Sequence, residues 1–269
     1  MSLKDVFIII EDRTTDAESR QRANNFVEEL TSAANKNPKC KVYFAKSYKN
    51  KNKGVIEKGD NIKVKFVLKL EKTDVQLEIR FDQYPVSNKE VKTAIGSQEA
   101  FIQNAGYSPS WGGEDTAHPL QFSLDLDADI TPFVTKENLE KETRQSLQVI
   151  LKDARRIMFH EVVHMIDDER MGPGKMRDVG NTWSKHNRDS EDDNGSSYYR
   201  QPLELNPNTQ EAIDSIVRTG DIGNSPAEFA DKVIKFMNSK SRYGEYVTGD
   251  ERKKVLKRVS TTWQHLKEK

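Results

Sequence analysis

Alternating apolar and polar residues mark a β-rich segment in the first half of the chain. Every second residue is apolar in residues 62–70 and again in residues 75–81, with a short polar turn between the two runs. Successive side chains of a strand point to opposite faces of a sheet, so these runs predict a β-hairpin with one buried face. Residues 120–126 alternate in the same way and predict a further strand, which we expect at an edge of the sheet.

The N-terminal segment predicts the order strand, helix, strand. Residues 5–11 are a short apolar run that predicts a buried strand. Residues 14–34 place apolar side chains on one helical face, and the Asn-Pro pair at residues 37–38 ends that helix. Residues 41–45 then return to an extended pattern.

From residue 136 onward the apolar residues follow helical spacing. One such run reaches residue 171, and a Gly-Pro-Gly sequence at residues 172–174 predicts its end. A polar stretch at residues 184–197 predicts a surface loop, and further helices follow. The fold class is therefore α+β, with a β-rich part at residues 1–135 and a helical part at residues 136–269 that together form one integrated unit.

Composition narrows the choice of partners. Of the 269 residues, 43 are Lys or Arg and 43 are Asp or Glu, so the net charge is zero and we expect neither a nucleic acid nor a membrane as partner. The lysine-rich residues 46–53 are expected to be a solvated loop. The single cysteine, Cys40, excludes an intrachain disulfide. The apolar run at residues 6–10 is too short for a signal peptide or a membrane span, so we expect a cytoplasmic or virion-associated protein.

The clearest chemical signal is the sequence His-Glu-Val-Val-His at residues 160–164. On a helix, His160 and His164 lie one turn apart on the same face, so both imidazoles can bind one tetrahedral metal ion. Glu161 lies beside the first histidine, and its carboxylate is free to hold a water molecule at the metal. The alternative is a pair of hydrogen-bonded histidines in a core.

This motif resembles that of the zincin metallopeptidases, whose metal helix carries His-Glu-x-x-His. The resemblance implies a zincin-like α+β fold, with a twisted mixed sheet and one catalytic Zn²⁺ held in part by His160 and His164. It also implies that Glu161 is the general base that activates a zinc-bound water, which then hydrolyses a peptide bond in a peptide or protein substrate.

The third metal ligand is expected downstream of the motif. Residues 198–204, Tyr-Tyr-Arg-Gln-Pro-Leu-Glu, are similar to the Tyr-x-x-x-Pro-x-Glu segment of phage-type metallopeptidases, which implies a gluzincin-like site with Glu204 as third ligand. Pro207 departs from that family's pattern, which continues a helix as Glu-x-x-Ala. A helix that instead begins at Pro207 and runs to residue 218 would offer Glu211 or Asp214 to the metal.

Several neighbouring residues have two interpretations each. Asp167 or Asp168 could accept a hydrogen bond from the second ring nitrogen of His164, or both could belong to an exposed acidic helix end. Tyr198 or Tyr199 could stabilise an oxyanion, or could pack under the second helix.

The sequence also offers two weaker candidate sites and two rival functions. His186 is expected to be solvated, and residues 111–113 (Trp-Gly-Gly) either border a substrate cleft or pack in the core. One rival is a virion or assembly protein that keeps a zinc site for its structure. The other is a zinc hydrolase of non-peptide amides. Glu161 argues against a structural site, because proton transfer requires that carboxylate and zinc binding does not.

Overall fold

The computed structural model describes residues 16–44, 56, 62–82, 91–109, 120–172, 202–240 and 246–267 of the chain. The chain forms two compact units, one made of Met1–Asn24 with Val162–Lys269 and the other of Asn25–Glu161. Helices α2 (Asp16–Ala34) and α4 (Arg155–Met171) contribute residues to both units. Among the described residues, no helix has the length and apolar character needed to cross a membrane.

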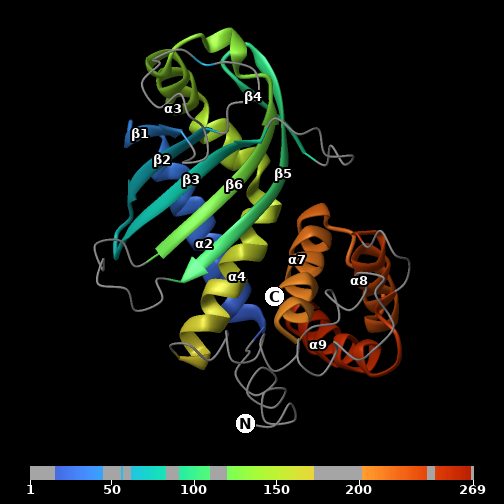
Figure 1. Cartoon of the computed structure of the whole chain (residues 1–269). Coiled ribbons are helices and arrows are strands. Elements are labelled where there is room, and N and C mark those ends of the chain that lie inside the picture. Colours follow the sequence, from blue (N-terminus) through green and yellow to red (C-terminus); the bar gives the residue numbers. More distant parts are fainter. Residues whose placement is uncertain are drawn as a thin grey trace, which may run out of the picture. The chain divides into compact units, whose positions relative to one another are not determined.

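A six-stranded mixed sheet forms the centre of the unit Asn25–Glu161 (Figure 1). Its strands are β1 (Lys39–Phe44), β2 (Ile62–Lys69), β3 (Asp74–Asp82), β4 (Val91–Ile95), β5 (Gln98–Pro109) and β6 (Leu120–Ala128). The spatial order is β1-β2-β3-β6-β5-β4, with β3 and β6 parallel and the other neighbours antiparallel. The α+β class and the predicted hairpin, β2 with β3, are confirmed.

One face of this sheet carries the apolar core of the unit. The alternating residues of β2, β3 and β6 on that face are fully or almost fully buried: Ile62, Val64, Phe66, Leu68, Val75, Leu77, Ile79, Phe81, Phe122, Leu124 and Leu126. Helices cover this face (Figure 1), and the ring of Phe26 on α2 lies 5.9 Å from that of Phe122. Helix α3 (Lys136–Asp153) packs on β1 and β4, and Thr135 caps its N-terminus by accepting from the N–H of Asn138.

The opposite face of the sheet is polar, and Glu78 on β3 is the most buried charged side chain among the described residues of that face. The Glu78 carboxylate accepts hydrogen bonds from Arg80 Nε at 2.6 Å and Lys63 Nζ at 3.0 Å, and lies 3.3 Å from Lys65 Nζ. Burial alone would raise the pKa of Glu78. The hydrogen bonds and positive charges of Arg80 and Lys63 outweigh that effect and hold the pKa below its ordinary value.

One expectation about the sheet is wrong, and one hairpin was not predicted. The strand at residues 120–126 exists as β6, but it is not an edge strand, because it lies between β3 and β5. The hairpin of β4 and β5 was not predicted. Its signal was present in the turn, because Gly96 has a φ of 58° and stands first in the Gly-Ser pair, which is typical of a type II′ hairpin turn.

Three helices form an apolar core in the other unit: α7 (Pro202–Thr219), α8 (Pro226–Lys240) and α9 (Gly249–Lys267). The core residues they share include Leu205, Ala212, Ile213, Phe229, Val233, Met237, Val255 and Val259. Gly220, with a φ of 73°, follows the last residue of α7, as helix C-termini commonly require.

The cation cluster around Glu78 gives a prediction about stability and pH. Glu78→Gln is expected to lower the free energy of unfolding by about 1–3 kcal/mol at neutral pH, because a buried acceptor of charge-assisted hydrogen bonds is weakened. The folded-state pKa lies below the unfolded value, so the difference between variant and wild type should shrink as pH falls below about 4.3. Urea denaturation of both proteins at several pH values measures this difference in the free energy of unfolding.

Glu99→Gln is the matched control. The Glu99 side chain is 52% exposed and pairs with Lys92, so its loss should change stability by less than about 1 kcal/mol. Equal effects of the two substitutions at neutral pH would contradict the special role of Glu78.

Candidate metal centre

Helix α4 combines a buried apolar surface with the polar residues of the motif. The apolar side chains that surround the motif are fully or almost fully buried: Met158, Phe159, Val162, Val163, Met165 and Ile166. The helix ends at Met171, where Gly172 adopts a φ of 87° and donates its N–H to the Asp168 carbonyl at 3.0 Å. The predicted helix end is thus confirmed, and tight packing fixes the orientation of the helix residues around the motif.

His160, Glu161 and His164 form a group that could hold a metal ion. Each offers one ligand atom, and these atoms all lie within 4.8 Å of one another. His164 is buried, whereas His160 and Glu161 are half-buried. Two imidazoles and a carboxylate are suitable donors for a transition metal such as zinc. The helical spacing therefore brings the donors together as the sequence predicted.

Glu204, in the first turn of α7, lies next to the second histidine of the motif. Its Oε2 is 3.5 Å from His164 Nε2, and only 8% of the Glu204 residue is exposed. Both residues belong to the unit that contains Val162–Lys269. A buried carboxylate at this distance is a further possible donor beside His164.

Helix α7 begins earlier than one sequence interpretation allowed. It runs from Pro202 to Thr219 without a break at Pro207, so a helix beginning at Pro207 is wrong. Pro202 occupies the first turn, where the missing N–H of proline has no helical partner to lose. Glu211 lies on the same helix face about two turns after Glu204 and is 2% exposed. Asp214 instead contacts Asn24 Nδ2 at 2.9 Å and Arg218 Nε at 3.0 Å.

Asn206 connects α7 with α4 and α9. Its Nδ2 donates to Asp167 Oδ2 at 2.6 Å, and its Oδ1 accepts from Arg258 Nη1 at 2.6 Å. Asp167 is buried, so its assignment to an exposed helix end is wrong. Burial raises the pKa of Asp167, and the hydrogen bond from Asn206 together with nearby positive charge opposes that rise only in part. The pattern of apolar and polar residues gives no signal for this contact between residues 39 positions apart.

A second contact that sequence could not predict joins Glu161 to the sheet. The backbone N–H of Tyr107 on β5 donates to Glu161 Oε2 at 2.8 Å. Among the described residues, β4 pairs with β5 only over Gln98–Ile102, so residues 103–109 form the sheet edge on that side. The Glu161 carboxylate is therefore held at an edge of the sheet as the described residues form it.

Four residues or segments with candidate roles lie outside the described part of the chain. They are His186, Tyr198, Tyr199 and residues 111–113. Their roles stay predictions, as does the surface loop at residues 184–197.

The Asn206 contacts give a prediction about stability. Asn206→Ala is expected to lower the free energy of unfolding by about 1–3 kcal/mol, because the buried Asp167 and the half-buried Arg258 each lose a hydrogen-bond partner. Asn224→Ala removes the same groups from an exposed position and should change stability by less than about 0.5 kcal/mol. Chemical denaturation of both variants checks this, and similar small effects would exclude a stabilising role for Asn206.

No family model, no curated protein and no solved structure matches this chain. The residues of the site themselves, with their distances and burial, are therefore the basis on which a function is assigned.

Proposed function

We propose that this protein is a zinc-dependent metallopeptidase with a zincin-like fold. His160, His164 and Glu204 are the proposed zinc ligands, and Glu161 is the proposed general base. The observation that carries the proposal is the 3.5 Å distance between His164 Nε2 and Glu204 Oε2, together with the grouping of the motif donors.

That distance fits two ligands of one metal ion. Donor atoms that each lie about 2.0–2.1 Å from a tetrahedral zinc ion are separated by roughly 3.4 Å. A good direct hydrogen bond between a histidine and a carboxylate would be shorter, at about 2.7–2.9 Å. Glu204 is also largely buried, and a buried carboxylate is costly unless a cation or hydrogen-bond donors balance its charge. A zinc ion would supply that balance.

Glu161 is the proposed catalytic residue. When bound, zinc acts as a Lewis acid toward a carbonyl oxygen and lowers the pKa of water. The Glu161 carboxylate takes the proton from the attacking water and later delivers it to the departing amine. The backbone N–H of Tyr107 donates to Oε2 of this carboxylate and helps to fix its position for the proton transfer.

The edge of β5 supports a peptide as substrate. Tyr107 lies opposite Phe122 of β6 and directs its N–H away from β6, toward Glu161. Backbone groups of an antiparallel strand alternate in direction, so Ala105 also presents its N–H and C=O to the outer side. An extended peptide can pair with such an edge through main-chain hydrogen bonds. Its backbone would then pass close to the Glu161 carboxylate.

The ligand assignment predicts the metal content of variants. Wild type should bind one zinc ion, and His160→Ala, His164→Ala and Glu204→Gln should each weaken binding by more than the roughly 10- to 100-fold typical of losing an outer-shell partner. Glu211→Gln is the control, because it alters a second buried carboxylate on the same helix. Mass spectrometry of metal-loaded protein and competition with a chelator measure this. Loss of zinc in Glu211→Gln but not in Glu204→Gln would reject Glu204 as ligand.

The base assignment predicts that activity and metal binding separate. Glu161→Gln should retain zinc and lose about 10²- to 10⁴-fold in kcat on a peptide substrate. Glu169→Gln changes an exposed carboxylate of the same helix and should keep full activity. If zinc is bound but wild type hydrolyses no member of a peptide library, the metallopeptidase assignment fails and a structural zinc site is indicated. Hydrolysis of small amides alone would indicate a non-peptide substrate.

A further inference from the structure

The polar face of the sheet concentrates positive charge on β1, β2 and β3. Five cationic residues of this face are here called the cation patch: Lys39, Lys41, Lys63, Lys65 and Arg80. Lys69 lies on the same face but stands directly opposite Asp74 and is not counted with them. Within it, Lys41 stands directly opposite Lys65, and Lys63 stands directly opposite Arg80. Like charges at directly opposite positions destabilise a sheet. A bound anion would reduce the repulsion between these cations, so the patch favours an anionic partner.

Carboxylates of the chain neutralise the cation patch only in part. Glu78 lies at its centre and contacts Lys63, Lys65 and Arg80 at once. Asp125 Oδ1 lies 3.7 Å from Arg80 Nη1. A third carboxylate, Asp127, lies two residues after Asp125 on the same face of β6. Among the described residues, three carboxylates thus lie on or beside this patch of five cations, which leaves a local excess of positive charge although the whole chain is neutral.

An aromatic ring lies among these cations. Tyr43 on β1 is 40% exposed, which makes it one of the few large apolar side chains that are exposed among the described residues. The ammonium groups of Lys41 and Lys65 each lie 5.4 Å from the centre of its ring. An exposed ring between cationic side chains can stack with a nucleobase while the cations contact the adjoining phosphates.

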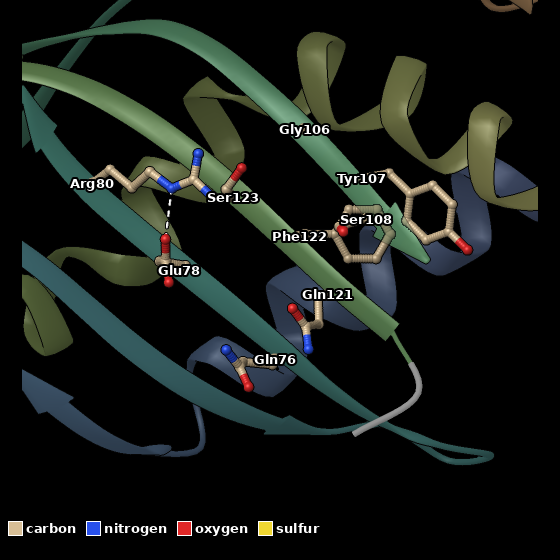
Figure 2. Close-up of a pocket in the computed structure, with 9 residues that line it drawn as sticks. All are labelled: Gln76, Glu78, Arg80, Gly106, Tyr107, Ser108, Gln121, Phe122 and Ser123. Carbon is tan, nitrogen blue, oxygen red and sulfur yellow. Dashed lines mark hydrogen bonds and ion pairs between the residues drawn. The ribbon is translucent and has the colours of Figure 1, made fainter. Parts of the chain in front are cut away.

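A pocket of about 240 Å³ adjoins the cation patch (Figure 2). Arg80 of the patch lines it, and so does Glu78, the carboxylate that three of the cations contact. Gln76 on β3 and Gln121 on β6 stand at paired positions and line it side by side. Gly106 keeps the β5 side open, because a Cβ there would lie 3.1 Å from Ser123 Oγ.

The lining of this pocket favours a neutral, hydrogen-bonding group. The amides of Gln76 and Gln121 and the hydroxyls of Ser108 and Ser123 offer both donors and acceptors. Arg80 already contacts the Glu78 carboxylate at 2.6 Å, so an entering carboxylate would meet a charge that is already balanced. A nucleobase edge carries mixed donors and acceptors and suits this lining better than an acidic side chain does.

We propose that the polar face of the sheet binds single-stranded nucleic acid. Phosphates contact the lysines of the cation patch, one base stacks on Tyr43, and another base enters the pocket of Gln76 and Gln121. The neutral whole-chain charge led us to expect no nucleic-acid partner, but a bound strand responds to the local patch and not to the average. The proposal does not depend on zinc or on Glu161.

Salt dependence is the first test. Full-length protein is titrated into fluorescently labelled single-stranded RNA and DNA of about 15 nucleotides, and anisotropy is recorded. Four neutralised phosphates, one for each lysine of the patch, predict that affinity falls roughly 50-fold between about 50 mM and about 200 mM salt. Absence of binding at the lower salt concentration, for both RNA and DNA, would overturn the proposal.

Charge variants locate the binding surface. Lys41→Gln combined with Lys65→Gln should reduce the logarithmic salt slope by about 1.4 and the affinity at low salt by roughly tenfold. Lys152→Gln combined with Lys257→Gln removes the same charge from exposed positions on α3 and α9 and should leave both unchanged. Circular dichroism verifies that each variant is folded. Equal losses in the two double variants would mean that binding is not localised to the patch, and the proposal fails.

Substitutions at the proposed base-binding residues test whether the ligand is a nucleic acid or an acidic protein segment. Tyr43→Ala should weaken binding by roughly 5- to 100-fold, and Gln121→Ala should also weaken it, both with an unchanged salt slope. Polyglutamate of similar length should compete poorly. If polyglutamate competes as well as the oligonucleotide and neither substitution has an effect, the surface binds acidic protein segments and the nucleic-acid proposal is rejected.

Discussion

The hydrogen bond between Asn206 and Asp167 is the interaction on which the arrangement of the candidate ligands His164 and Glu204 depends. It joins the last part of α4 to the first part of α7 within one unit, and Arg258 of α9 completes the connection. Buried polar groups are costly unless they are hydrogen-bonded, so α4 and α7 must pack in an arrangement that keeps Asp167 and Asn206 in contact. Two residues before Asn206, the same helix presents Glu204 to His164. A structural contact thereby positions a candidate ligand.

In the unit Asn25–Glu161, the alternation of side chains along the strands decides which residues form the core and which form the polar face. Alternation sends one set of side chains of β2, β3 and β6 into the apolar core and the other set to the polar face. The apolar set packs against α2 and holds the strands in place. The polar set contributes nothing to that core and carries charged, amide and hydroxyl groups instead. Glu78 holds three cations together there. At the edge of β5, backbone groups are available for contacts such as that of Tyr107 with Glu161.

The spacing of apolar residues along the chain predicted those helices and strands in which that spacing is regular. The helix of the motif, the helix at residues 16–34 and the hairpin of β2 with β3 follow from regular apolar spacing. The β4 and β5 hairpin was missed because its strands alternate weakly, although the Gly96-Ser97 turn carried a signal. The position of β6 was wrong because strand order depends on which residues meet across the sheet. A strand with polar alternate residues looks like an edge even when, as here, it lies inside the sheet.

The sequence by itself determined the α+β class and the grouping of His160, Glu161 and His164, because residues four apart on a helix must share a face. It also indicated Glu204, but only through resemblance, and it left open whether α7 begins before Pro207. Tertiary structure decided that α7 is continuous, that Glu204 lies beside His164, and that Asn206 and Tyr107 contact the motif helix. These contacts join residues 39 to 54 positions apart, and no local periodicity encodes such pairs.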